Sequence, residues 1–167
     1  MILNLSDKVV AVDIDKEELK ELENNCPKNL KNKLEISCID ITKKFPFEKN
    51  TFDGVFCTGT LHLFDEDTIN NILLEIERVL KHKGKILFDF ATDILRFDDN
   101  NKQIIFNGEG NYKTEEAIKL FQRKLKNFTF NIEKNEFKEV NLDSKARYKF
   151  IKGNFLIISG LLDKNNF

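Results

Sequence analysis

Two strand-like segments that each end in aspartate constrain the fold of this chain more than any other feature. Residues 9–12 form a continuous apolar run that ends at Asp13, and residues 34–39 form a second strand pattern that ends at Asp40. Such runs are typical of strands buried in parallel sheets. Because parallel strands place their carboxyl ends at one edge, Asp13 and Asp40 are predicted to lie where open α/β sheets bind ligands.

Helical and strand patterns alternate along the rest of the chain. Apolar residues at helical spacing predict a helix over residues 68–81, with Asp65 or Asp67 as N-cap and Gly84 as its left-handed C-terminal cap. A shorter helix is predicted to start at Asp15. The remaining predicted elements are strands at 52–57 and 85–90, a loop at 92–112, a helix capped by Thr114, and an antiparallel hairpin from strands at 128–140 and 147–162.

This order of elements predicts an α/β fold with a mostly parallel sheet and a C-terminal antiparallel hairpin. No linker, repeat or low-complexity tract divides the chain, so residues 1–167 are predicted to form a single domain. A Gly-x-Gly pair at 108–110 follows no strand and opens no helix, which indicates a loop.

Composition excludes several classes of protein. The three cysteines show no metal-ligand spacing and cannot all pair, so we expect neither a disulfide scaffold nor a zinc site. No apolar run has the length of a membrane span, and no basic leader opens the chain, which favours a cytoplasmic protein that does not bind membranes.

The net charge of −1 hides an uneven distribution. Residues 113–152 carry eleven Lys/Arg and six Asp/Glu, an excess that could serve an anionic or nucleic-acid partner. The lysines are scattered without interleaved exposed aromatics, so the sequence favours a solvated face, and a nucleic-acid partner is not expected.

An aspartate that closes a strand is more often a turn or helix cap than a ligand-binding group. The order of the surrounding motifs favours binding: residues 9–15, then 38–41 with 45–47, then 52–64, and then 78–85. In this order and spacing the chain resembles the class I S-adenosylmethionine-dependent methyltransferases of the small-molecule type. The resemblance covers nearly the whole chain and implies a three-layer α/β/α Rossmann-like sheet, S-adenosylmethionine as cofactor, and a small-molecule methyl acceptor.

The resemblance also implies roles for individual residues. Seven are implied to bind the cofactor: Asp13 at the ribose hydroxyls, Ile14 and Ile41 at the adenine ring, Asp40 at the adenine amine, and Cys57, Thr58 and Gly59 at the methionine end. His62 is a candidate general base, and the sequence favours the alternative, a polar residue at a helix start. Asp89 and Asp93 are weaker candidates for substrate contact, and capping is the alternative for Asp93.

The start of the chain departs from the family pattern. The family's first strand and glycine-rich loop should precede residue 9, where only residues 1–8 stand, so the sequence predicts an N-terminally truncated domain. Residues 1–5 fit a helix end, or a strand that pairs with residues 9–13. An open sheet edge could also be covered by a homodimer partner or a second subunit.

Two alternatives to an active methyltransferase follow from this departure. One is a degenerate, non-catalytic copy that acts as a binding or assembly subunit. The other is a nucleotide-binding α/β domain with unrelated chemistry, which would bind adenosine without recognising a sulfonium.

Overall fold

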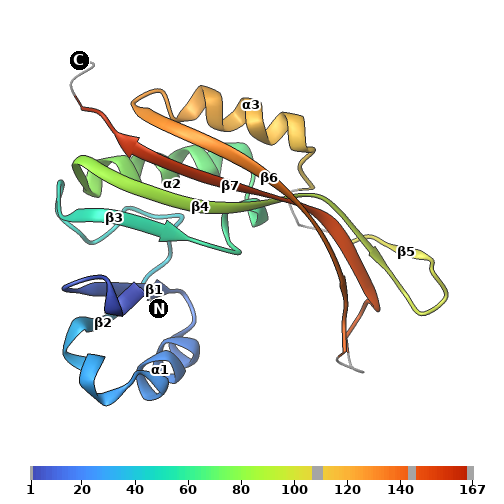
Figure 1. Cartoon of the computed structure of the whole chain (residues 1–167), viewed down its shortest axis with the longest axis horizontal. Coiled ribbons are helices and arrows are strands. Elements are labelled where there is room, and N and C mark those ends of the chain that lie inside the picture. The colour runs from blue at the N-terminus through green and yellow to red at the C-terminus, as the bar shows by residue number, and fades with distance from the viewer. Residues whose placement is uncertain (1, 107–110, 143–145, 165–167) are drawn as a thin grey trace. The chain divides into compact units, whose positions relative to one another are not determined.

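The computed structural model describes residues 2–106, 111–142 and 146–164, and the chain divides into two compact units, Met1–Pro46 and Phe47–Phe167 (Figure 1). Each unit is described by itself. The predicted Gly-x-Gly at 108–110 lies outside the described residues. That residues 1–167 form one domain stays a prediction.

The first unit is built on a pair of parallel strands. Its elements are η1 (Ile2–Asn4), β1 (Val9–Asp13), α1 (Lys16–Asn25), η2 (Lys28–Lys33) and β2 (Leu34–Cys38). β1 and β2 pair in parallel with Asp13 opposite Cys38, as the sequence predicts. Asp15 caps α1, because its carboxylate accepts hydrogen bonds from the amides of Glu17 and Glu18.

The first unit has a small apolar core of its own. Leu3, Cys26 and Leu30 are buried, and Val9 and Leu34 pack against them. Residues 2–4 form a 3-10 turn and not a strand, so the predicted option of pairing with β1 is wrong. The buried Leu3 explains the turn, because it places this side chain in the core.

The second unit is a mixed sheet with two helices. Its elements are β3 (Phe52–Cys57), η3 (Leu61–Leu63), α2 (Glu66–Val79), β4 (Leu80–Phe97), β5 (Gln103–Ile104), α3 (Thr114–Lys124), β6 (Phe128–Val140) and β7 (Phe150–Leu162). The strand order is β3-β4-β7-β6, and β5 pairs with the far end of β4. β3 and β4 are parallel, whereas β7 is antiparallel to both β4 and β6, which confirms the predicted hairpin at the sheet edge.

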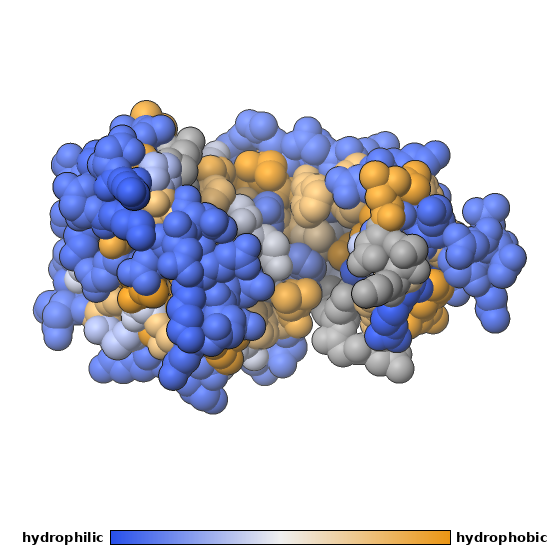
Figure 2. Space-filling model, turned by 90° about the horizontal axis from the view of Figure 1, so that it is seen from below, coloured by the Kyte–Doolittle hydropathy of each residue, from blue (hydrophilic) through white to orange (hydrophobic). Residues whose placement is uncertain are grey.

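Alternation along β4 decides which face of the sheet the helices cover. Phe88 and Phe90 are fully buried, and the Phe90 ring lies edge-on to Phe121 of α3 at 5.1 Å. Leu87 points to the other face and is exposed, next to the exposed Phe56 in the β3–β4 register. Figure 2 shows such apolar areas as separate patches between larger hydrophilic areas. The large apolar residues of α2 fill the same core: Ile69, Ile72, Leu73, Ile76 and Val79.

The structure corrects two predictions around β4. The helix that was predicted over 68–81 ends at Val79, and the left-handed residue after it is Lys83 (φ 60°), not Gly84. β4 does not stop at residue 90 but continues to Phe97, so part of the predicted 92–112 loop is strand. The local sequence is polar and predicts a loop. The chain nevertheless forms a strand, because it pairs with β7 on both sides of a bulge between Thr92 and Leu95.

The start of α3 also differs slightly from the prediction. Lys113 is the N-cap, and Thr114 is the first helical residue. The Asp93 carboxylate accepts a hydrogen bond from the amide of Thr114 at 3.1 Å, so this side chain supplies the cap from the neighbouring strand. The capping alternative for Asp93 is therefore confirmed.

No helix in the described ranges combines the length and the apolar character that crossing a membrane requires.

Candidate functional site

In the first unit, the carboxyl ends of β1 and β2 bring the predicted adenosine-binding residues to one edge. Asp13 closes β1, and the backbone pairing extends one residue further, because the amide of Ile39 donates to the carbonyl of Asp13 at 2.9 Å. Asp40 follows directly. The two carboxylates predicted from the sequence therefore share the edge that was expected to bind a ligand.

Each of these carboxylates uses one oxygen to hold a local turn. Asp13 Oδ1 accepts the amide of Asp15 at 2.9 Å, and Asp40 Oδ1 accepts the amide and the hydroxyl of Thr42 at 2.9 and 2.6 Å. Over the described residues, the second oxygen of each carboxylate has no protein partner. Each side chain is thus positioned by its turn and keeps one acceptor for a ligand.

The hydrogen bonds at Asp40 also set its charge. The Thr42 hydroxyl and amide lower the pKa of this carboxyl, Lys43 adds a smaller effect in the same direction, and slight desolvation opposes them. Asp40 therefore stays ionised at neutral pH. An ionised carboxylate accepts hydrogen bonds from an amine or hydroxyl more strongly than a neutral acid does.

Ile14 and Ile41 lie beside these carboxylates in the chain. The Ile14 side chain is 70% exposed, and its carbonyl accepts a weak hydrogen bond from the Cys38 thiol at 3.4 Å. An exposed isoleucine next to an aspartate offers an apolar surface for a planar ring. Ile41 is half-buried in the turn after Asp40.

In the second unit, the carboxyl end of β3 carries Cys57, Thr58 and Gly59. Gly59 has φ +64°, a left-handed conformation that favours glycine, and a Cβ built at this position meets no atom within 4 Å. Its amide donates to Asp89 Oδ1 of β4 at 2.6 Å. The Thr60 hydroxyl closes the turn on the carbonyl of Thr58 at 2.8 Å.

Asp89 of β4 therefore holds the loop that the resemblance assigns to the methionine end. The sequence suggests Asp89 as a possible substrate contact, but its bond to Gly59 depends on the β3–β4 register, which no local pattern reveals. The same surroundings affect Cys57: burial raises the pKa of its thiol to about 11, the Asp89 charge adds to this, and a hydrogen bond with Thr60 opposes it. A thiol with this pKa is protonated at neutral pH and is not a nucleophile.

His62 lies in η3, directly after this loop. Its ring is edge-on to Phe90 at 6.2 Å, and the Tyr112 ring also packs edge-on to Phe90 at 5.0 Å. The Tyr112 hydroxyl donates to the carbonyl of Phe64 at 2.8 Å, which ties the start of α3 to the loop after η3. Tyr112 lies in the segment predicted to be a loop, so no pattern in the sequence indicates that it contacts Phe90 and Phe64.

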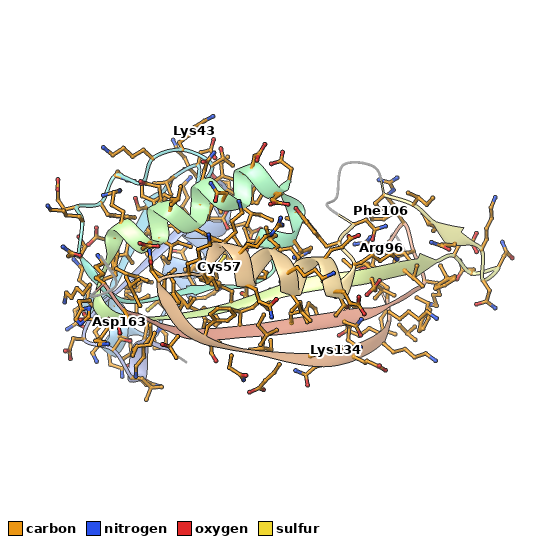
Figure 3. The ribbon with its side chains drawn as sticks, turned by 90° about the horizontal axis from the view of Figure 1, so that it is seen from above. Lys43, Cys57, Arg96, Phe106, Lys134 and Asp163 are labelled. Carbon is orange, nitrogen blue, oxygen red and sulfur yellow. The ribbon has the colours of Figure 1, made fainter. Side chains whose placement is uncertain are left out.

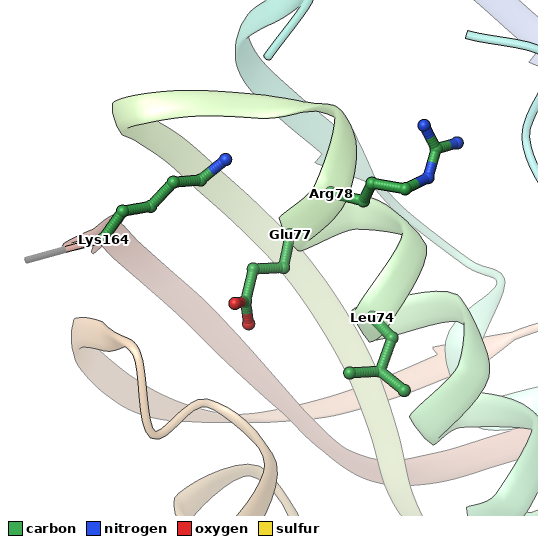
Figure 4. Close-up of a pocket in the computed structure, with 4 residues that line it drawn as sticks. All are labelled: Leu74, Glu77, Arg78 and Lys164. Carbon is green, nitrogen blue, oxygen red and sulfur yellow. The ribbon is translucent and has the colours of Figure 1, made fainter. Parts of the chain in front are cut away.

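One cavity of the second unit does not coincide with any of these residues. It has a volume of about 410 Å³ and is lined by Leu74, Glu77, Arg78 and Lys164, at the C-terminal end of α2 (Figure 4). Its charges already serve the fold: Arg78 pairs with Glu75 at 2.7 Å and donates to the carbonyl of Phe47. Glu77 accepts from Asn127, so this cavity indicates structural contacts and not a site.

The structure thus brings the predicted residues together in two groups. One comprises Asp13, Ile14, Asp40 and Ile41 in the first unit, and the other comprises Cys57, Thr58, Gly59 and His62 in the second. Within the described part of the chain, no cluster of acidic, histidine or cysteine side chains has the composition of a metal site.

Comparisons with known proteins agree with the fold. Among solved structures, a Bacillus halodurans protein superposes with a TM-score of 0.66 at 17% identity, covering 93% of this chain and 83% of its own. A S-adenosylmethionine-dependent methyltransferase from Methanosarcina mazei gives 0.61 at 17% identity, with 98% and 86% covered. The protein DhpI, solved as a complex with SAH, gives 0.64 at 15% identity, with 98% and 70% covered.

These likenesses confirm the predicted α/β, Rossmann-like class, with a sheet that is mixed. No curated protein matches the chain. The profile of a family described as a methyltransferase domain matches residues 1–88, which is more than half of the chain. This protein therefore belongs to the methyltransferase domain family.

Proposed function

We propose that this chain binds S-adenosylmethionine and catalyses transfer of its methyl group to a small-molecule acceptor. The observation that carries the proposal is the pair of carboxylates at the β1–β2 edge, each fixed by a turn and each with one open oxygen. When bound, the cofactor supplies an electrophilic methyl group on a sulfonium.

The residues of the first unit fit the adenosine half of this cofactor. Asp13 has an acceptor for a ribose hydroxyl, Asp40 has one for an exocyclic amine, and Ile14 offers an exposed apolar surface to the ring. Charge-assisted hydrogen bonds of this kind are about twice as strong as neutral ones.

The resemblance assigns the methionine half to Cys57, Thr58 and Gly59. Gly59 leaves the backbone uncovered by a side chain, and Asp89 holds the loop through the Gly59 amide. Transfer to an atom that is already nucleophilic needs mostly proximity and alignment, so a rigid loop is the main contribution required of the protein. For an acceptor that must lose a proton, His62 is the candidate base.

Calorimetric titration of S-adenosylmethionine and S-adenosylhomocysteine against the chain tests this proposal. We expect both to bind, and Asp13→Ala to weaken the binding about tenfold, the equivalent of about 1.4 kcal/mol. Asp7→Ala is the matched control, because Asp7 is exposed and lies at the other end of β1.

Two results would contradict the proposal. Absence of binding at millimolar cofactor would favour the non-catalytic alternative. Binding of adenosine that equals binding of S-adenosylmethionine would favour a nucleotide-binding domain that does not recognise the sulfonium. Association with a second copy or subunit along an open strand edge stays a prediction, which sedimentation of the chain can test.

A further inference from the structure

A cavity lined by both apolar and charged residues lies beside the β4 bulge between Thr92 and Leu95. This bulge cavity has a volume of about 320 Å³, and its lining includes Asp93, Leu95, Glu136, Lys138, Lys152 and Asn154. Leu95 is six residues beyond Asp89 along β4, which corresponds to about 20 Å. Bulges often occur beside functional sites, where they redirect side chains.

Two lysines face each other directly across the strands that line this cavity. Lys138 of β6 is the register partner of Lys152 of β7, and Leu95 of β4 completes the row. Lys138 Nζ lies over the Phe150 ring at 5.1 Å, and Lys152 Nζ lies over the Phe97 ring at 5.6 Å. The centroids of the Phe97 and Phe150 rings are 5.8 Å apart, so both ammonium groups lie over one continuous aromatic surface.

This arrangement leaves positive charge uncompensated. Like charges directly opposite each other destabilise a strand pair, and neither lysine forms an ion pair with any described residue. A cation–π contact at an exposed site offsets only part of this repulsion, because it contributes about 0.5–1 kcal/mol.

The acidic residues of the cavity do not neutralise the two lysines. Asp93 is engaged by Lys113 at 3.2 Å and by Thr114 and Asn154. Burial is the largest single effect on its carboxyl and raises the pKa, but the bonds from Thr114 and Lys113 together outweigh it and keep the pKa low. They also hold Asp93 in a left-handed conformation, with φ 51°. Among the described residues of the lining, Glu136 is the only other acid, so with Asp93 paired to Lys113 it can balance only one of the two lysines.

A second group of cations lies near these strand ends, and Arg96, which directly follows Leu95 along β4, faces the other side of the sheet. Arg96 and Arg147 stack on the Phe106 ring at 4.5 and 4.7 Å near the same strand ends. Figure 3 shows Arg96 and Phe106 next to each other there. Cationic groups above aromatic rings favour an anion that carries an apolar body over a simple inorganic ion.

We propose that the bulge cavity binds a small organic anion, whose carboxylate or phosphate bridges Lys138 and Lys152 while its apolar part contacts Leu95. The proposal does not depend on methyl transfer. It names a second binding site, which accounts for two lysines placed directly opposite each other beside the bulge.

Titrations of the full chain with benzoate and with phenyl phosphate, followed by amide NMR, test the proposal and distinguish the two anion types. We expect shifts at Leu95, Lys138 and Lys152 with at least one probe. The double variant Lys138→Gln/Lys152→Gln should bind at least tenfold more weakly. The matched control is Lys134→Gln, an exposed lysine on the same strand, which should bind as the wild type does.

Three results would overturn the proposal. The first is equal binding by the double variant. The second is an equal set of shifts with sodium chloride at the same ionic strength, which would show charge screening only. The third is binding of single-stranded DNA without binding of either small probe, which would indicate a polyanion surface. Both lysines are exposed, so the variants are expected to fold, and a thermal melt checks this.

Discussion

Replacing Gly59 with alanine should loosen the loop after β3 without creating a clash. A Cβ at this position meets nothing within 4 Å, so the effect comes only from the backbone at φ +64°. An L-residue with a Cβ loses about 1–2 kcal/mol in this conformation. We therefore expect the free energy of unfolding to fall by about 1 kcal/mol, or the loop to change conformation at similar cost.

A second variant, Asp89→Ala, should loosen the same loop because it removes the acceptor of the hydrogen bond from the Gly59 amide. Hydrogen bonds to charged groups contribute about 1.5–3 kcal/mol, and exposure of Gly59 to solvent reduces this to about 1 kcal/mol. Because Gly59→Ala and Asp89→Ala disturb the same contact, their effects should not add. A double-mutant cycle should show a coupling of at least about 0.5 kcal/mol.

Urea denaturation measures the stabilities, and calorimetry with S-adenosylhomocysteine and adenosine measures binding. Each variant should weaken S-adenosylhomocysteine binding several-fold while adenosine binding stays unchanged, because the loop is assigned to the methionine end. Gly54→Ala is the control, since Gly54 lies on β3, the strand before this loop, and its added Cβ would make only an ordinary 3.5 Å contact. Strictly additive stabilities, or equal losses for both ligands, would refute the reasoning.

Three further predictions concern stability. Phe90→Ala should lower the free energy of unfolding by about 3–5 kcal/mol, because Phe90 is fully buried, whereas Phe56→Ala at a 52% exposed position should cost far less in the same urea melts. Gly160→Ala should cost about 1–3 kcal/mol by overpacking, since its Cβ would lie 2.9 Å from Phe130 Cβ; a wild-type melting temperature would contradict this. For Cys57, the raised pKa favours the neutral thiol in the folded state, so its contribution is complete below about pH 9 and is lost as the pH rises through about 11. The stability difference between wild type and Cys57→Ala should therefore change over that window and stay constant from pH 7 to 8.5.

The parts of the fold that could be predicted are those with a strong local period. The apolar spacing of α2 places the helix within two residues of its observed bounds, and the run before Asp13 identifies β1. Local patterns do not predict strand bounds that depend on hydrogen bonding with a distant strand. β4 continues past residue 90 because β7 supplies hydrogen bonds on both sides of the bulge, and an Asp93 in the left-handed region interrupts the alternation that would reveal a strand.

The residues of the candidate site likewise fall into those that local patterns predict and those that depend on strand register. Asp13 and Asp40 were predictable because a strand end is a local feature and parallel pairing then brings the two ends together. Asp89 and Lys152 depend instead on register: the first meets Gly59 from thirty residues away, and the second meets Lys138 across a hairpin. A shift of one residue in either pairing would turn these side chains to the opposite face. The sequence can therefore nominate the acidic strand ends, whereas the loop-holding aspartate and the lysine row become visible only when the register is known.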